Sequence, residues 1–253
     1  MSEDMQGKVV LVAGASSGIG RATAEMFAMR GASVLLSARR EDALSHVTDT
    51  IVSRGGVACF RGGDVSCAAD VEAMVLSTVD AYGRIDICVN AAGIGGELAP
   101  IVDLTEEGWD NTLAINLKGA FFCIKYAARA MLAAGHGGAI VNVGSVASFL
   151  GFAAGSAYSS AKHGMIGLTS SASAELAPKD IRVNLVCPGV VDTPMHHQAR
   201  QMLGDDLALP DIHLNRIAQP QEIARSILYL CSDESSFITG TTLTVDGGGT
   251  STL

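Results

Sequence analysis

The sequence predicts a single α/β domain, a doubly wound parallel sheet of Rossmann type with helices on both faces. Seven short apolar runs recur along the 253 residues, and the stretches between them are long enough for helices. Most of these runs are continuously apolar rather than alternating, which indicates strands buried on both faces. Strands that alternate with helices are typical of this fold class. The expected strands are Val9 to Ala13, Ser33 to Ala38, Val57 to Arg61, Ile85 to Val89, Ala139 to Val143, Arg182 to Val186 and Thr242 to Val245.

Composition narrows the class of protein. Apolar residues make up 48% and charged residues 17%, which is typical of a compact globular chain. No Pro-rich linker or internal repeat divides residues 1–253, so we expect one domain. A formal charge of -9 would repel nucleic acid and anionic lipid, and we expect neither as a partner. The start of the chain lacks the pattern of a secretory signal, which favours a cytoplasmic location. Because the cysteines and histidines form no ligand grouping, we expect no metal site.

The first strand leads into a glycine-rich turn that fits a dinucleotide. The turn is Gly14-Ala15-Ser16-Ser17-Gly18-Ile19-Gly20, and a helix should follow from Gly18 to Arg30 and end at Gly31. Glycines let the helix begin close to a pyrophosphate, whose charge is met by free N–H groups and by the positive end of the helix dipole. Glycines also occur in plain tight turns. The position after the first strand of a βαβ unit favours the dinucleotide site.

The end of the second strand bears on which nicotinamide cofactor binds. An acidic side chain there would hold the adenosine ribose of NAD and would repel the extra phosphate of NADP. The strand instead ends Ala38-Arg39-Arg40-Glu41. A guanidinium can hold a phosphate through two hydrogen bonds, although an arginine pair at a strand end can also be solvated charge. We favour NADP(H), with NAD(H) as the other possibility.

Three residues farther along the chain form a pattern that fits proton transfer. Ser145 follows the fifth strand, Tyr158 comes thirteen residues later, and Lys162 is four residues beyond Tyr158. Four residues are about one helical turn, so Tyr158 and Lys162 should share a face. An adjacent ammonium favours the phenolate, which predicts a lowered pKa for Tyr158 and suits it as a general acid and base. Ser145 would donate a hydrogen bond to the substrate oxygen.

Together these motifs resemble those of the short-chain dehydrogenase/reductase family. The resemblance runs from Lys8 to Gly249 and includes the tetrad Asn90-Ala91-Ala92-Gly93 after the fourth strand. It implies a Ser-Tyr-Lys triad with Asn116 as a fourth catalytic member, which would kink its helix and hold a water that relays protons to Lys162. Two positions depart from the family pattern. Ala13 replaces a threonine that supports the tetrad, and Ala91 replaces a second asparagine.

The resemblance also implies the remaining cofactor contacts. It assigns Asp64-Val65 to the adenine ring, and it assigns the backbone of Val191 and the hydroxyl of Thr193 to the nicotinamide amide and the phosphates. The discriminating aspartate of the family would stand at Ala38. The expected cofactor-binding residues are Gly14, Ser16, Ser17, Gly18, Ile19, Gly20, Arg39, Arg40, Asp64, Val65, Asn90, Ala91, Gly93, Tyr158, Lys162, Pro188, Gly189, Val191 and Thr193.

Residues 192–219 form the least regular part of the sequence. This segment is rich in Gln, Met and His and is bounded by prolines, so we expect an excursion from the sheet that serves as a substrate lid. The expected lining, Ile94 to Leu98, Phe149 to Phe152 and Met195 to Gln219, offers no charged anchor for a recognised metabolite. An apolar, uncharged carbonyl or alcohol is therefore the expected substrate.

The resulting hypothesis is an NADP(H)-dependent oxidoreductase that interconverts a ketone and a secondary alcohol, with Tyr158 as the general acid and base. A 3-oxoacyl-(acyl-carrier-protein) reductase is one alternative. A dinucleotide-sensing regulator without turnover is another, although a sensor has no physical need for a complete set of proton-transfer groups. The resemblance further implies a tetramer or dimer of identical chains, with Asp246 to Gly249 near an interface.

Overall fold

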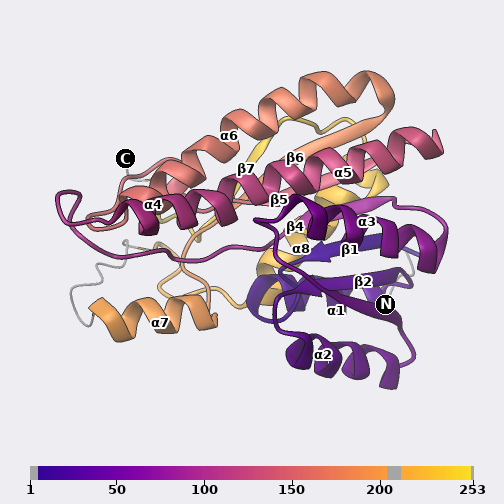
Figure 1. The fold of residues 1–253 in the computed structure, drawn as a ribbon, viewed down its shortest axis with the longest axis horizontal. Helices are drawn as coiled ribbons and strands as arrows, with labels where there is room; N and C mark the ends of the chain where they lie inside the picture. Colours follow the sequence, from indigo (N-terminus) through magenta and orange to yellow (C-terminus); the bar gives the residue numbers. More distant parts are fainter. Residues whose placement is uncertain (1–4, 204–211, 252–253) are drawn as a thin grey trace.

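The computed structural model describes residues 5–203 and 212–251. Seven parallel strands form one sheet in the order β3-β2-β1-β4-β5-β6-β7 (Figure 1). Strand order reverses between β1 and β4, and in such sheets the crevice for a ligand opens at that point. The strands are β1 (Val9–Ala13), β2 (Ser33–Ala38), β3 (Val57–Gly62), β4 (Ile87–Asn90), β5 (Gly138–Val143), β6 (Ile181–Pro188) and β7 (Thr242–Val245).

Helices cover both faces of the sheet. In Figure 1, α3, α5 and α6 lie on one face, while α1, α2 and α8 lie on the other. None of the helices in the described part of the chain is long and apolar enough to cross a membrane. The helices are α1 (Gly18–Met29), α2 (Glu41–Ser53), α3 (Ala68–Tyr82), α4 (Glu106–Leu113), α5 (Gly119–Ala134), α6 (Ser156–Leu176), α7 (Pro194–Leu203) and α8 (Pro220–Cys231), with a π turn η1 (Ala114–Lys118) and 3-10 turns η2 (Val146–Ser148), η3 (Ala177–Lys179) and η5 (Asp233–Ser235).

The apolar core has a large cluster on each face of the sheet. Phe27 of α1 and Leu44 of α2 pack with Ile223 of α8 on one face. Met74 of α3 and Met131 of α5 pack under the other. Each fully buried side chain of this size contributes roughly 1.5 to 3 kcal/mol, so the two clusters hold the strands and helices in register.

The seven expected strands are all present, and their ends differ from the expected ones by up to two residues. Burial on both faces, which the sequence indicates for most of the strands, does not extend to the two edge strands, β3 and β7. Val57 of β3 is 52% exposed and Phe60 is 38% exposed. The first helix ends at Met29 rather than at Arg30, and Gly31 follows with a φ of +91°, a left-handed conformation that suits glycine.

Candidate active site

Tyr158, Lys162 and Ser145 converge at the carboxyl ends of the central strands. Tyr158 and Lys162 lie one turn apart on α6, and the Lys162 Nζ lies 5.6 Å from the centroid of the Tyr158 ring. Lys162 also donates a hydrogen bond of 2.8 Å to the carbonyl of Val143, at the end of β5. The Ser145 hydroxyl is hydrogen-bonded to the Tyr158 phenol. The spacing in the sequence therefore corresponds to three side chains that lie close together.

Burial controls the protonation of this group. Desolvation raises the pKa of Tyr158 above that of a free phenol, and the hydrogen bond from Ser145 opposes this shift only in part. Desolvation also lowers the pKa of Lys162 to about 8. The expected lowering of the Tyr158 pKa is wrong for this structure, because desolvation is the largest influence on the phenol and raises its pKa.

Asn116 lies beside Lys162 and is held by the loop after β4. The π turn η1 interrupts the helical run between α4 and α5 at Asn116, and this is the helix distortion that the resemblance implies. The Asn116 side chain is buried, accepts from the N–H of Ile94 at 2.9 Å and donates to its carbonyl at 2.9 Å. A Cβ added to Gly93 would lie 2.8 Å from Asn116 Oδ1 and 3.9 Å from Lys162 Nζ. Only glycine leaves room at that position.

The glycine turn packs backbone to backbone against the loop after β4. Gly14 has a φ of +86°, and a Cβ there would lie 2.5 Å from the N atom of Ala92. A Cβ on Gly20 would lie 2.2 Å from the carbonyl oxygen of Gly14, which explains why the start of α1 needs glycine. The N–H of Ala91 donates to the carbonyl of Ala13 at 2.9 Å, so a backbone bond ties this loop to β1 where the family has a threonine.

The start of α1 fits a pyrophosphate. Ser17 has extended backbone and its side chain makes no capping hydrogen bond, and the first turn carries no acidic side chain. The N–H groups at this end of the helix are therefore available to an anion, and the helix dipole favours one. Across the turn, Thr193 Cγ2 would lie 3.2 Å from a Cβ on Gly18. The loop after β6 thus closes the other side of the cradle.

The two arginines lie at the exposed end of the same turn. Arg39 and Arg40 are both exposed, and Arg40 Nη2 donates to Ser16 Oγ at 3.3 Å. Next to β3, one oxygen of Asp64 accepts hydrogen bonds from the N–H and the hydroxyl of Ser66. Val65 is buried and packs close to Gly119 of α5. The residues expected at the adenosine end therefore border one side of the sheet crevice.

The loop after β6 leads into the excursion that the sequence predicts. Pro188 ends β6, and Gly189 donates to the carbonyl of Val245 in β7. Val191 pairs with Ala218, so the two ends of the excursion lie side by side. Between these ends the structure forms α7, which projects away from the sheet in Figure 1. The middle of the expected lid, residues 204–211, lies outside the described residues.

The side chains of Asn90 and Cys187 are buried at the carboxyl ends of β4 and β6. The Asn90 side chain points into the sheet, where Nδ2 donates to Asn142 Oδ1 at 2.6 Å, so only its backbone faces the crevice. Cys187, at the carboxyl end of β6, is buried in an apolar cluster with Met165 and Leu185. Burial raises the pKa of its thiol, and the neighbouring Ser148, Ser145 and Lys162 oppose this shift. Its position at the carboxyl end of β6 was the signal for a place in this site.

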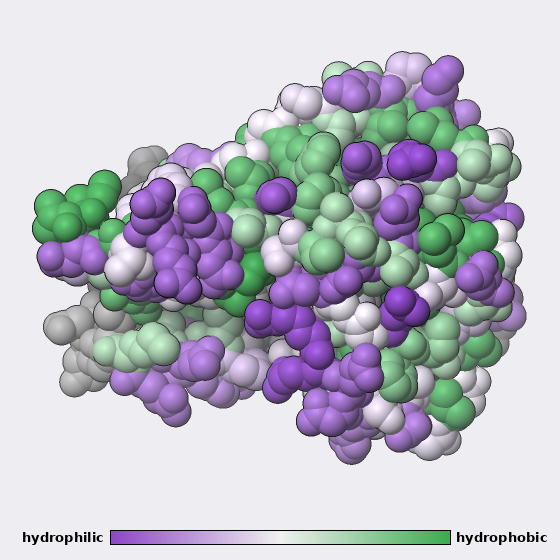
Figure 2. Space-filling model, in the orientation of Figure 1, coloured by the Kyte–Doolittle hydropathy of each residue, from purple (hydrophilic) through white to green (hydrophobic). Residues whose placement is uncertain are grey.

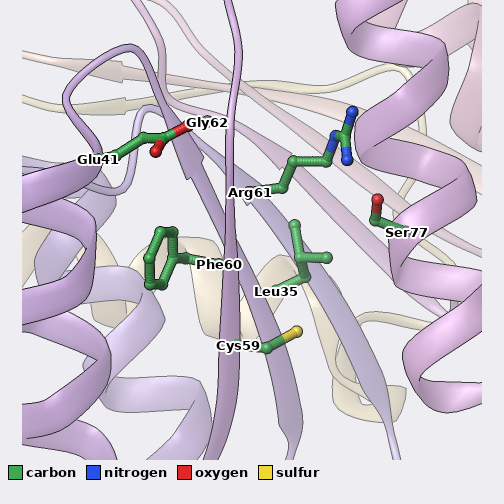
Figure 3. Close-up of a pocket in the computed structure, with 7 residues that line it drawn as sticks. All are labelled: Leu35, Glu41, Cys59, Phe60, Arg61, Gly62 and Ser77. Atoms are coloured by element: carbon green, nitrogen blue, oxygen red, sulfur yellow. The ribbon is translucent and has the colours of Figure 1, made fainter.

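A separate pocket of about 350 Å³ lies at the β3 edge, away from the triad (Figure 3). Glu41 and Phe60 lie on one side of the strand in that view, and Arg61 points toward Ser77 of α3 on the other. None of the triad residues lines it. In residues 5–203 and 212–251, no group of three His, Cys, Asp or Glu side chains could hold a metal ion.

Comparisons with known proteins agree with this geometry. A family model described as enoyl-(acyl carrier protein) reductase matches residues 14–250. Cyclohexanol dehydrogenase of Acinetobacter sp. strain SE19 is 39% identical over 252 residues, which cover 99% of this chain and 98% of that enzyme. A 3-oxoacyl-(acyl-carrier-protein) reductase of Thermotoga maritima is 38% identical, covering 96% of this chain and 98% of that enzyme.

A solved structure extends the likeness to three dimensions. A variant of actinorhodin polyketide ketoreductase with NADPH superimposes with a TM-score of 0.90 at 34% identity, covering 98% of each chain. The similarity in sequence and structure thus spans nearly the whole molecule and includes the motifs described above. The chain is an oxidoreductase that acts on alcohol or ketone groups, and it belongs to the short-chain dehydrogenase/reductase family.

Proposed function

We propose that this enzyme interconverts a ketone and a secondary alcohol with NADP(H), and that Tyr158 gives and takes the proton. The observation that carries the proposal is the convergence of Ser145, Tyr158 and Lys162 near a glycine turn that fits a dinucleotide. When bound, the nicotinamide supplies or accepts the hydride. The protein's own residues then have to orient the substrate oxygen and manage its proton.

The raised pKa of Tyr158 suits its part in reduction. At neutral pH the phenol is protonated and can give its proton to the oxygen of the ketone. Ser145, hydrogen-bonded to the same phenol, is placed to donate to that oxygen as negative charge builds there. Oxidation needs the phenolate instead, so alcohol oxidation should become faster as the pH rises. Lys162 and Asn116 both lie close to Gly93 and belong to the same group of side chains as Tyr158.

Preference for NADP(H) is supported by the charge at the adenosine end. Ala38 leaves that position without a carboxylate, and Arg40 already reaches the glycine turn through Ser16. Arg39 is exposed and free to turn toward a phosphate. The similar polyketide ketoreductase was solved with NADPH. NAD(H) is the alternative, and replacing Arg39 and Arg40 by Gln should raise KM for NADPH far more than KM for NADH.

An apolar ketone or alcohol is the proposed substrate. Phe149 and Phe152, from the loop between β5 and α6, are exposed near the site. The N–H of Ala99 donates to the carbonyl of Ala154, which ties this loop to the one after β4. Glu97, an acidic residue of the expected lining, is hydrogen-bonded to Thr105. Figure 2 shows apolar side chains gathered at the end of the molecule beyond α4, and α7 is proposed as the described part of the lid.

A 3-oxoacyl thioester is the alternative substrate, favoured by the description of the family model and by the Thermotoga maritima relative. The two candidate substrates can be distinguished by their reduction rates. Under our proposal a 3-oxoacyl thioester should be a poorer substrate than a cyclic ketone such as cyclohexanone. The opposite order would favour the carrier-protein reductase.

The test is NADPH consumption with cyclic ketones by the wild type, Tyr158→Phe and Tyr229→Phe. Tyr229 is exposed on α8 and serves as the matched control. Loss of the Tyr158 hydroxyl should lower kcat by at least about 100-fold, because proton transfer by a positioned side chain contributes at least that much. Equal rates for the wild type and Tyr158→Phe would overturn the catalytic assignment, and cofactor binding without turnover in the wild type would favour the sensor.

We also propose that the chain assembles as a dimer or tetramer. Phe121 and Leu132 are exposed apolar residues of α5, a surface that a second copy could cover. Size-exclusion chromatography with light scattering should give two or four times the chain mass, and a monomer would contradict this proposal.

A further inference from the structure

We propose that Asn142 and Thr169 are positioning residues, which fix the catalytic helix α6 at the depth and rotation that the reaction needs. They form a buried hydrogen-bonded connection from Asn90, the last residue of β4, through β5 to α6. The inference rests on the proposed function, because the reaction for which α6 is positioned is the proposed one. It concerns two residues that do not touch the reacting groups.

The connection consists of two hydrogen bonds between side chains. Asn90 Nδ2 donates to Asn142 Oδ1 at 2.6 Å, and Asn142 Nδ2 donates to Thr169 Oγ1 at 2.9 Å. Asn90 and Asn142 are opposite each other in the paired strands β4 and β5. Asn142 is 0% exposed and Thr169 is 1% exposed, so water does not compete for these bonds. Because both ends of the Asn142 amide are engaged, its orientation is fixed.

Thr169 lies on the same face of α6 as the catalytic pair. Tyr158, Lys162, Met165 and Thr169 follow at intervals of four, three and four residues, which is one stripe along a helix. Lys162, Met165 and Thr169 are all buried on the sheet side. Burying a threonine hydroxyl is costly unless it has a hydrogen-bond partner, and here that partner comes from β5.

Strand β5 therefore holds α6 at two points. Val143 accepts the bond from Lys162 Nζ, and its neighbour Asn142 donates to Thr169, seven residues farther along the helix. Seven residues span about 10 Å of helix, so the two bonds together oppose sliding and rotation of α6 on the sheet. The rest of this stripe meets apolar residues such as Leu185 and Cys187, whose packing is not directional.

Precise placement of α6 matters because it sets the distance between the Tyr158 hydroxyl, Ser145 and the substrate. A displacement of about 1 Å can cost up to about 100-fold in rate. It would also change the hydrogen bond and the desolvation that set the pKa of Tyr158. A merely structural bond would affect stability but leave the pH dependence of the reaction alone.

The experiment compares Thr169→Val, Thr169→Ser and a control, Thr78→Val. Valine keeps the shape of threonine and removes the hydroxyl, while serine keeps the hydroxyl. Thr78 is a fully buried threonine of α3 whose hydroxyl bonds to the carbonyl of Met74 in its own helix, so its replacement costs a buried hydrogen bond away from the site. The measurements are kcat, KM and the Kd for NADPH across pH, with unfolding midpoints in urea.

We expect Thr169→Val to lower kcat about tenfold, to shift the midpoint of the kcat pH profile and to leave Kd for NADPH within about twofold. Thr169→Ser should restore both the rate and the profile. Thr78→Val should lower the unfolding midpoint without changing either. If Thr169→Val matches Thr78→Val in rate and profile, the positioning role is wrong. If Thr169→Val does not fold, Thr169→Ala replaces it in the same comparison.

Hydrogen exchange of the amides in residues 156–165 separates this inference from the proposed function. Thr169→Val should speed exchange there relative to Thr78→Val at equal stability, and Thr169→Ser should not. If the wild type turns over no ketone, the proposed function fails, and the exchange result alone then decides whether the two residues position α6. Unchanged exchange in Thr169→Val would overturn the inference.

Discussion

Lys162 keeps a charged group inside the protein. Only 4% of the residue is exposed, and burial lowers the pKa of its ammonium from 10.5 to about 8. The nearby acceptors are the carbonyl of Val143 and the sulfur of Met165, which are uncharged. The protein thus gives up stability to hold a proton carrier beside Tyr158, as active sites commonly do.

This cost predicts how Lys162→Met changes stability with pH. Below pH 8 both the folded and the unfolded chain carry the proton, and the folded state pays the full cost of burying it. Between pH 8 and 10.5 the folded state loses the proton first, so the unfolded state binds more protons and the wild type gains stability as the pH rises. The advantage of the methionine variant should therefore shrink by on the order of 2 to 3 kcal/mol between pH 7 and pH 10.

Urea unfolding of both proteins at pH 7 and pH 10 measures this difference. Lys179→Met, the same change at an exposed lysine, controls for the loss of one charge. A stability difference between Lys162→Met and the wild type that stays constant with pH would show that the buried ammonium is not destabilising.

At the scale of elements, the strands and the order of the motifs could be predicted from the sequence alone. Short apolar runs predicted all seven strands, and for the inner strands the pattern is continuous because they are buried on both faces. The edge position of β3 was not predictable in this way, since Val57 and Phe60 are as apolar as the residues of the inner strands. The π turn at Asn116 depends on two bonds to Ile94, which lies 22 residues earlier in the chain. No local pattern carries that information.

The candidate site was predictable to a similar extent. The spacing of Tyr158 and Lys162 is a property of one helix, so the sequence alone sufficed. The protonation of Tyr158 depends on how much water the folded chain removes, and that depends on the packing of several elements. The direction of the Asn90 side chain depends on Asn142, which is distant in sequence and adjacent only in the sheet.

Arg182, near the start of β6, connects several elements. We therefore expect its substitution to have a large effect on stability. Its guanidinium donates to the carbonyl of Leu230 in the last turn of α8, and to the carbonyls of Ser232 and Ile238 and the hydroxyl of Ser235 in the connection from α8 to β7. Arg182→Met would remove these four partly buried hydrogen bonds, although Ser235 and Asn184 would still donate to the carbonyls of Ser232 and Ile238. We expect a loss of on the order of 3 kcal/mol in the free energy of unfolding, measured by urea denaturation.

Arg216→Met is the matched control for that change. Arg216 makes two hydrogen bonds to Glu222 on the exposed surface, where water can replace them. Its substitution should cost clearly less than Arg182→Met. Equal losses would mean that the bonds of Arg182 contribute no more than a surface ion pair.

At the scale of the whole molecule, the cofactor cradle is built from both halves of the sheet. The glycine turn follows β1, whereas Thr193 follows β6 and lies against Gly18 of that turn. The loop after β4 packs against Gly14 of the same turn. A ligand in this cradle contacts segments that are some 180 residues apart in the chain, so its binding should stabilise the fold as a unit.

Thermal unfolding with each cofactor tests both this coupling and the proposed preference. At a free concentration 100 times its Kd, a ligand adds about 2.7 kcal/mol, which corresponds to roughly 5 to 10 °C in Tm for a chain of this size. At equal concentrations NADPH should therefore raise Tm more than NADH does. In the double variant R39Q/R40Q the two shifts should become similar, because the guanidinium groups that would hold the extra phosphate are gone. A larger rise in Tm with NADH than with NADPH in the wild type would reverse the proposed cofactor preference. If either cofactor split the unfolding curve into two transitions, the coupling of the two halves of the sheet would be contradicted.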